Sequence, residues 1–248
     1  MRRLLVVNAD DFGRSAGIND GVAAGYEQGI VTSASLMVRW PDAPAAAAYA
    51  RAHPGLGVGL HVDLGEWEPC DGEWRAVYEV ASGSDVDREV REQLDRFREL
   101  VGRDPTHLDS HQHVHREEPE RSVVRALGDE LGVPVRGESP VAYCGSFYGA
   151  GADGSSVPEH VSPEWLVALV VELEPGATEL GCHPAARVDI ASVYAAQRVT
   201  ELRALCSPTV RDAIEARGVE LCSFPAAAAA MRERSPESLG LTVRAWHD

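Results

Sequence analysis

The 248-residue sequence predicts an α/β protein with a single domain, residues 1–248, folded as a (β/α) barrel. Short apolar segments rich in β-branched residues alternate with amphipathic segments, which is typical of parallel strands joined by right-handed helical crossovers. About 250 residues is also the usual length of such a barrel. An open doubly wound sheet is the alternative, but no glycine-rich phosphate or dinucleotide loop follows the first apolar segment. We therefore expect a barrel that is irregular or has about seven strands.

The first strand is expected at residues 4–9, where a continuous apolar run containing Val6 and Val7 indicates burial on both faces. Further strands are expected at residues 30–38, 57–64, 104–115, 133–136, 179–182 and 219–224. The 104–115 segment is expected to run out of the core into a loop.

Helices are expected between these strands. Residues 15–28 place Ile18, Val22 and Tyr26 on one side, and Gly29 can end the helix. The clearest helix is 85–101, whose apolar stripe comprises Val86, Val90, Leu94, Phe97 and Val101. Other helices are expected at 41–52, 119–131, 163–173 and 190–217, the last broken at Pro208, and an alanine-rich helix with a charged tail ends the chain.

Two segments lack such a pattern and are expected to be loops. Residues 65–84 show no clear periodicity, with Trp67 and Trp74 either exposed or folded over a cleft. Residues 144–162 are rich in Gly, Ser, Ala and Pro, and a loop of this length is usually functional or disordered. We expect it at the rim of the site as a lid.

A row of polar side chains marks the 104–115 segment. Histidines or aspartate occupy every second position, namely His107, Asp109, His111, His113 and His115. In an extended strand, alternate side chains point to the same face, so one face presents imidazole and carboxylate groups. A single histidine on such a strand is usually structural, but this row is what a divalent ion requires.

Other strand ends carry matching groups. Asp10 and Asp11 follow the first strand, although either could instead cap the next helix, as Ser15 could. His61 lies near the end of the third strand, and His183 follows the strand at 179–182. A barrel brings the carboxyl ends of its strands to one rim, where Asp11, His61 and His111 would leave coordination positions open for water and substrate. Such ligands suit Zn²⁺, Mn²⁺ or Co²⁺, or Mg²⁺ completed by waters, and spacing does not choose among them.

The composition indicates which classes of partner the protein can bind and in which cellular compartment we expect it. The formal net charge of −16 argues against nucleic acid or an anionic membrane as a partner, because both require clustered basic residues. The initial apolar run breaks at Asn8, so we expect a first strand and no signal peptide, and no apolar run reaches the length of a membrane span. Five scattered cysteines favour reduced thiols in a cytoplasm. The oligomeric state stays open, a homodimer included.

Several motifs occur together in one order along the chain: the segment 5–13 (LVVNADDFG), the segment 29–38 (GIVTSASLMV), the segment 58–61 (VGLH), the segment 106–115, and His183 and Pro184 with Asp189 downstream. In these motifs the chain resembles the YdjC-like carbohydrate deacetylases, a family that includes chitooligosaccharide deacetylases. The resemblance implies a barrel related to the polysaccharide deacetylases. It also implies hydrolysis of the N-acetyl group of a small amino sugar or oligosaccharide at one divalent metal ion, with Asp11, His61 and His111 as ligands. The segment 63–84 departs from the family pattern, so the resemblance does not define the size of the substrate.

This function suggests further roles. Water attacks the acetyl carbonyl while the ion polarises it, and Asp10 is the candidate general base. Because adjacent residues in a strand point to opposite faces, Asp10 and Asp11 are expected to differ in role. His183 is the candidate acid, with His113 and His115 as competitors that could instead contact substrate or orient a ligand. Arg136 is a candidate contact for substrate oxygens, or a member of a surface ion pair.

Two alternative functions are also compatible with the sequence. One is a metal-dependent hydrolase of another bond, such as a phosphoester, which the scarcity of nearby cations supports poorly. The other is a sugar-binding protein without catalytic activity on the same fold, which the presence of both base and ligand candidates disfavours.

Overall fold

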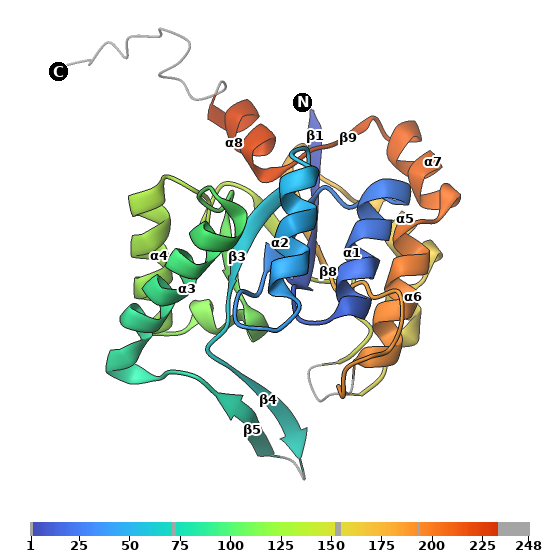
Figure 1. Cartoon of the computed structure of the whole chain (residues 1–248). Helices are drawn as coiled ribbons and strands as arrows, with labels where there is room; N and C mark the ends of the chain where they lie inside the picture. Colours follow the sequence, from blue (N-terminus) through green and yellow to red (C-terminus); the bar gives the residue numbers. More distant parts are fainter. Residues whose placement is uncertain (1, 71–72, 152–154, 193, 233–248) are drawn as a thin grey trace, which may run out of the picture.

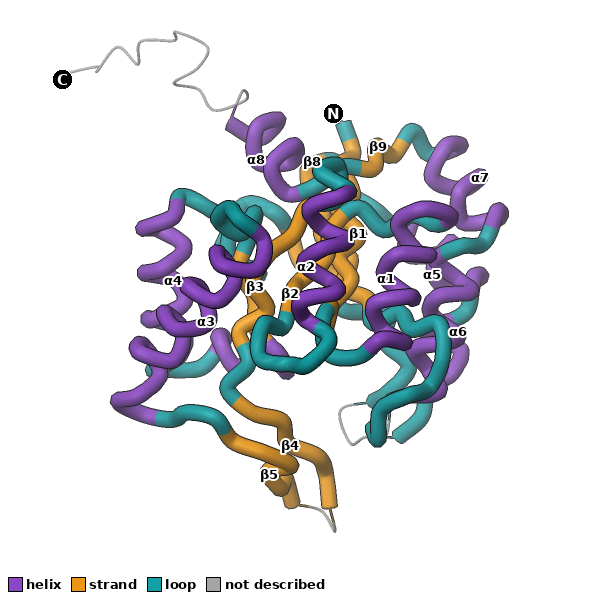
Figure 2. The backbone as a smooth tube through the Cα atoms, in the orientation of Figure 1, coloured by secondary structure: helices purple, strands orange, loops and turns teal. Residues whose placement is uncertain are grey.

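The computed structural model describes residues 2–70, 73–151, 155–192 and 194–232. Its centre is a parallel sheet in the order β6, β3, β2, β1, β8, β7, with β9 also paired to β1. These strands are β1 (Arg3–Phe12), β2 (Ser33–Leu36), β3 (Gly57–Val62), β6 (Leu108–Ser110), β7 (Ala142–Cys144), β8 (Gly176–Cys182) and β9 (Val219–Leu221). Helices surround the sheet, which curls into an irregular (β/α) barrel and confirms the predicted fold class (Figures 1 and 2).

The helices lie close to their predicted positions. They are α1 (Ala16–Gln28), α2 (Ala43–Ala52), α3 (Val86–Val101), α4 (Glu120–Leu131), α5 (Pro163–Val171), α6 (Ala195–Leu205), α7 (Pro208–Ala216) and α8 (Phe224–Arg232), with short 3₁₀ turns η1 (Gly83–Asp85), η2 (His111–Arg116) and η3 (Pro158–Val161). Ser15 caps α1 by accepting a hydrogen bond from the Ile18 N–H. The predicted charged tail lies outside the described residues. Within them, no helix is both long enough and apolar enough to cross a membrane.

Three local predictions were wrong. The expected loop at 65–84 contains an antiparallel hairpin, β4 (Gly65–Cys70) and β5 (Glu73–Glu79), which projects from the barrel (Figure 1). Its apolar alternation is weak because much of β5 is exposed and has no core to face. The strand expected at 104–115 ends at Ser110 and turns into η2, and the strand expected at 133–136 is a single bridge between Val135 and Leu108.

Strand β1 organises the barrel. At its start it pairs with β9 through residues 3–5, and further along it pairs with β2, so two strands share one edge in succession. Alternate side chains of β1 face opposite ways: Leu5 and Val7 belong to the large core beneath the helices, whereas Leu4 and Val6 belong to a smaller separate cluster. The alternation continues to Asp10, so the same face that is apolar at the start of β1 is charged at its end.

The smaller cluster closes the amino end of the barrel. It consists of Leu4, Val6, Val141, Ala177, Phe224 and Ala227, so α8 packs against strands β1 and β8. The Phe224 ring stacks on the His107 imidazole, with ring centroids 3.9 Å apart. Polar side chains are therefore left to gather at the carboxyl end.

Candidate metal centre and cavity

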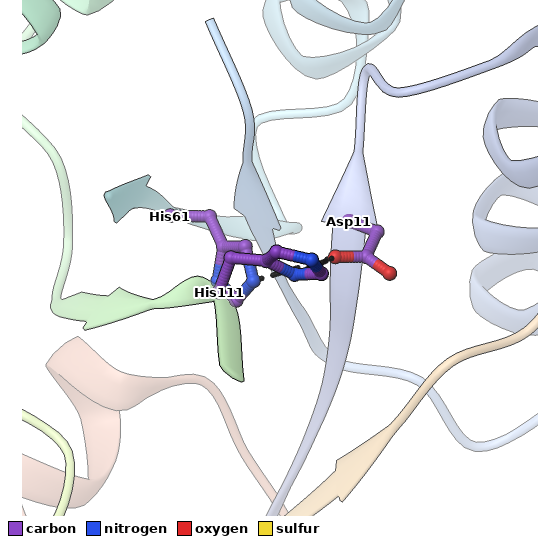
Figure 3. A group of neighbouring side chains, drawn as sticks. All are labelled: Asp11, His61 and His111. Atoms are coloured by element: carbon purple, nitrogen blue, oxygen red, sulfur yellow. Dashed lines mark ion pairs between the residues drawn. The ribbon is translucent and has the colours of Figure 1, made fainter. Parts of the chain in front are cut away.

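Three side chains from separate strands meet at the carboxyl end of the barrel. Asp11 lies near the end of β1, His61 lies in β3, and His111 begins η2 directly after β6. Asp11 Oδ1 lies 3.4 Å from His61 Nε2 and 3.1 Å from His111 Nδ1 (Figure 3). One ligand atom from each residue falls within 4.8 Å of the other two, and all three residues are buried. The structure therefore brings together the three predicted metal ligands.

The backbone at Asp11 makes this meeting feasible. Asp11 has a φ of 64°, a left-handed conformation that is uncommon for residues other than glycine, and the pairing of β1 with β2 is irregular between Ala9 and Phe12. A regular strand would point Asp10 and Asp11 to opposite faces. The irregularity instead lets both carboxylates line one cavity. Strain of this kind persists only where the surrounding contacts maintain it, and it is concentrated at functional sites.

The donor set fits a divalent cation. Asp11 Oδ1 accepts no hydrogen bond of acceptable geometry from the described residues, although it is buried between two imidazole nitrogens. Burial by itself would lower the pKa of His61, but the Asp109 carboxylate and other acidic neighbours raise it to about 10. The pKa of His111 is raised in the same way, chiefly by Asp11. A site that favours positive charge this strongly also attracts a cation, and mixed nitrogen and oxygen donors suit Zn²⁺, Mn²⁺, Co²⁺ or Mg²⁺.

A second group, Asp10, His61 and Asp109, also has side-chain atoms close enough together to hold a metal ion. In this group, however, the guanidinium of Arg136 already pairs with both carboxylates. The Arg136 guanidinium donates two hydrogen bonds of 2.7 Å to Asp10, and its Nη2 lies 2.7 Å from Asp109 Oδ2. It also donates to Glu179 at 2.7 Å. The positive charge of Arg136 thus takes the place that a metal ion would need in this group.

Arg136 keeps Asp10 ionised. Burial by itself would raise the pKa of Asp10, but the charge and the paired hydrogen bonds of Arg136 outweigh it, so this pKa is lowered. Asn8 Nδ2 donates a further hydrogen bond of 2.8 Å to Asp10 Oδ1. Asp10 therefore lines the cavity as a fixed carboxylate, which suits a proton acceptor.

His183 faces Asp10 from the end of β8. Its Nε2 lies 3.8 Å from Asp10 Oδ2, and its Nδ1 lies 3.9 Å from Glu201 Oε1. The backbone N–H of His183 donates a hydrogen bond to the Glu201 carboxylate, which anchors this turn to α6. Burial lowers the pKa of the imidazole to about 4, so His183 is neutral at pH 7.

These groups border a cavity of about 830 Å³. Trp67 from the β4–β5 hairpin and Tyr148 from the 144–162 segment contribute aromatic walls, and the predicted loop therefore does lie at the rim of the site. The hairpin is held there by Gln112, whose side chain accepts from Trp67 N–H at 2.8 Å and donates to Trp67 C=O at 2.7 Å. A volume of this order suits a small-molecule ligand.

Not all of the other predicted site residues border the cavity. His113 lines the cavity and hydrogen-bonds Tyr143 through Nε2 at 3.2 Å. His115 and Arg136 do not line the cavity, and each is only 1% exposed. His115 contacts Ser110 Oγ at 2.6 Å and the Arg136 carbonyl oxygen at 3.1 Å. The structure thus places both beneath the site, where Arg136 supports Asp10, so substrate contact is not supported for either.

The backbone of η2 explains why His115 does not reach the cavity. Gln112 and His113 have φ values of 51° and 57°, so the alternation of the predicted strand is lost after His111. Up to that point the alternation holds, because His107 and Asp109 both contact Ser35 Oγ, at 3.0 and 2.7 Å.

Three residues near the site were not predicted from the sequence: Tyr148 and Arg198, which line the cavity, and Glu201, which is buried and accepts a hydrogen bond from the His183 N–H. They lie in segments whose sequence shows only ordinary loop or helix character, and long-range packing alone brings them to the site. Asp109 was named only as a member of the polar row, and the structure shows that it accepts a hydrogen bond from His61 Nδ1 at 2.8 Å.

Comparisons with known proteins agree with this geometry. Residues 4–216 match the family of YdjC-like proteins. The chain belongs to this family. A carbohydrate deacetylase of Geobacillus stearothermophilus is 35% identical, covering 90% of this chain and 98% of its own, and a chitooligosaccharide deacetylase of Serratia marcescens is 36% identical, covering 90% and 99%.

Two solved structures share the fold of this YdjC-like protein. A crystal structure from Enterococcus faecalis superposes with a TM-score of 0.73 at 25% identity, covering 91% of this chain and 99% of the other. A family 4 carbohydrate esterase from Streptomyces lividans, in complex with acetate, gives a TM-score of 0.52 at 14% identity, covering 89% and 91%. The second likeness concerns the fold alone.

The raised histidine pKa values predict that metal binding depends on pH. An imidazole must be neutral to bind a metal ion, yet His61, with a pKa of about 10, is protonated and positively charged at pH 7 in the metal-free protein. Binding therefore releases at least one proton, and affinity should rise about tenfold per pH unit from pH 6 to 8.5. Calorimetric titration with Mn²⁺ in buffers of different ionisation enthalpy measures both quantities. Affinity that is independent of pH would contradict this protonation state.

Replacement of Asp109 tests its support of His61. Asp109→Asn removes the charge that orients His61 Nδ1 at 2.8 Å, and loss of such a partner typically weakens metal binding by about 10–100-fold. Asp104→Asn is the matched control, because Asp104 pairs with Arg98 on the surface. Metal affinity should fall only in the first variant, and equal affinities in both would remove Asp109 from the site.

Proposed function

We propose that this protein is a metal-dependent carbohydrate deacetylase that hydrolyses the N-acetyl group of a small amino sugar or oligosaccharide. One observation carries the proposal: an ionised Asp10, fixed by Arg136, faces His183 at 3.8 Å, directly beside the Asp11, His61 and His111 set. Amide hydrolysis needs a base for the attacking water and a proton for the leaving amine, and this pair can supply both. Two relatives, a carbohydrate deacetylase and a chitooligosaccharide deacetylase, also support this proposal.

The ligands Asp11, His61 and His111 would hold one divalent ion, with Zn²⁺, Mg²⁺, Mn²⁺ and Co²⁺ all compatible with the donors. A bound ion supplies Lewis acidity toward the acetyl oxygen and so promotes attack by water. Asp11 would hold the ion through Oδ1, because its Oδ2 accepts a hydrogen bond from Arg198 and Oδ1 has no hydrogen-bond partner among the described residues.

Proton movements are the task of Asp10 and His183. Asp10 Oδ2 accepts the proton of the attacking water, since it is the carboxylate oxygen nearest to His183. Neutral His183 has Nε2 facing this oxygen and Nδ1 facing Glu201, so Nε2 can take the proton and deliver it to the nitrogen of the leaving amine. The products are acetate and a free amine, and both residues return to their starting protonation states.

The walls of the cavity agree with a carbohydrate substrate. Trp67 and Tyr148 provide aromatic surfaces, and polar side chains such as Gln197 and Ser192 alternate with them. Sugars combine apolar ring faces with hydroxyl groups, so this mixture is complementary to them. We further place the protein in the cytoplasm, because Cys144, Cys182, Cys206 and Cys222 are free thiols, as expected in a reducing compartment.

The test is release of acetate. The protein is stripped with a chelator, reloaded with Zn²⁺, Mn²⁺, Co²⁺ or Mg²⁺, and incubated with N-acetylated mono- and oligosaccharides while free acetate is measured. We expect acetate release with at least one ion and none in the stripped protein. Hydrolysis of phosphoesters under the same conditions, or sugar binding without acetate release, would favour the two alternative functions.

Separate replacement of the two neighbouring aspartates distinguishes their roles. Asp11→Asn should weaken metal affinity, because a charged ligand becomes neutral. Asp10→Asn should leave metal affinity nearly intact and lower kcat by about 10²-fold or more, since an amide cannot accept the proton. Asp212→Asn, on the exposed face of α7, is the control.

Calorimetric metal titration and acetate release at saturating metal measure the two effects, with circular dichroism to check folding. If the Asp10 variant retains wild-type kcat, the base must be another group, and His113 is then the next candidate.

A further inference from the structure

Arg198, in α6, borders the cavity and has hydrogen-bond donors that are not paired with any described residue. Its side chain is buried, with the residue only 4% exposed, and Nη2 donates a hydrogen bond to Asp11 Oδ2. Nε and Nη1 are also buried, yet neither has a hydrogen-bond partner among the described residues. The Arg198 backbone is fixed as well, because its carbonyl oxygen accepts from Ala185 N–H at 3.1 Å.

The other buried arginines near the site differ from Arg198. Arg136 donates hydrogen bonds to Asp10 and Glu179, forms an ion pair with Asp109, and does not line the cavity. Arg14 also keeps unpaired nitrogens, but it pairs with Glu66, lies over the Trp40 ring and does not line the cavity. Within the described part of the chain, Arg198 is the one buried guanidinium that both borders the cavity and retains unpaired N–H groups.

Unpaired N–H groups on a buried cation are costly, because they have lost water without gaining another acceptor. An oxygen atom of a ligand would remove this cost. Two features indicate which oxygen: Arg198 is bound to Asp11, so it lies beside the candidate metal position, and it lines the same cavity as Asp10 and His183. In the proposed reaction the acetyl oxygen would lie beside the metal position, in the same cavity.

We propose that Arg198 is a catalytic residue that donates a hydrogen bond to the acetyl oxygen and stabilises the negative charge that develops on it. This inference rests on the proposed deacetylase function. As water attacks, the carbonyl π electrons move to the acetyl oxygen, and when the C–N bond breaks they return to re-form the carbonyl. A fixed guanidinium is suited to this task because its donors are already oriented and need no rearrangement when the charge appears.

The main experiment compares Arg198→Lys with the wild-type protein. Lysine can keep one contact with Asp11 Oδ2 but cannot donate to a second oxygen from a planar fork. Loss of an oxyanion donor should lower kcat by about 10²- to 10³-fold, while KM changes by a few-fold at most. Metal affinity, measured by calorimetry, should stay within about threefold of wild type, whereas affinity of the metal-loaded protein for acetate should fall about tenfold.

Arg211→Lys is the matched control, because Arg211 contacts backbone carbonyls of Gln28 and Gly29 far from the cavity and all four quantities should stay unchanged. Circular dichroism checks folding. Arg198→Gln is made in parallel, so that the comparison still decides the matter if the lysine variant does not fold.

Four results would overturn the assignment. Unchanged kcat with weaker metal binding would mean that Arg198 only positions Asp11. A raised KM with unchanged kcat would mean that it binds a sugar hydroxyl equally in ground and transition states. If the wild-type protein neither releases acetate from any acetylated sugar nor binds acetate, the deacetylase function fails and this role with it, whereas an active wild type with an equally active Arg198→Lys overturns the role alone.

Discussion

The site depends on one buried positive charge. Arg136 is enclosed by Asp10 from β1, Asp109 from β6 and Glu179 from β8, all within hydrogen-bond distance. A buried guanidinium is tolerable only with such partners, and removal of one partner from a buried ion pair typically costs about 3–5 kcal/mol. Strands β1 and β8 are neighbours, but β6 lies three positions from β1 in the order of the sheet, so the sheet must curl for Asp109 to reach the same guanidinium. The curvature of the barrel is thus required for the cluster that keeps Asp10 ionised.

Two chains of contacts lead outward from Arg136. One passes through Asp109 to His61 Nδ1 and on to the candidate metal position, so the arginine indirectly orients a ligand. The other ends at Asp10, the proposed base. Three carboxylates share the single positive charge of Arg136, and their pKa values differ. Burial raises the pKa of Glu179 to about 7, whereas the pKa values of Asp10 and Asp109 are lowered. The carboxylates used for function are those kept ionised.

Much of this arrangement was accessible from sequence, because it depends on local pattern and on the rule that strands present functional groups at their carboxyl ends. That rule places Asp11, His61 and His111 at one rim, and the match to the family motifs selects them as the ligands. The positions of His115 and Arg136 could not be predicted in this way. Two residues with left-handed backbone after His111 redirect η2, so His115 does not continue the strand. The sequence around Arg136 resembles that of any strand end and does not indicate a buried ion cluster. Arg198 is harder still. Nothing in an ordinary amphipathic helix indicates that one of its arginines will meet a carboxylate 187 positions earlier in the chain.

The packing of α8 bears on where the working unit ends. The family match stops at residue 216, yet β9 occupies the edge of β1 at Arg3–Leu5, and Phe224 stacks on His107 inside the barrel. His107 in turn contacts Ser35, which also holds Asp109. The end of the family match is therefore not the end of the packed fold. A change at Phe224 would be transmitted toward the active centre through a single imidazole, that of His107.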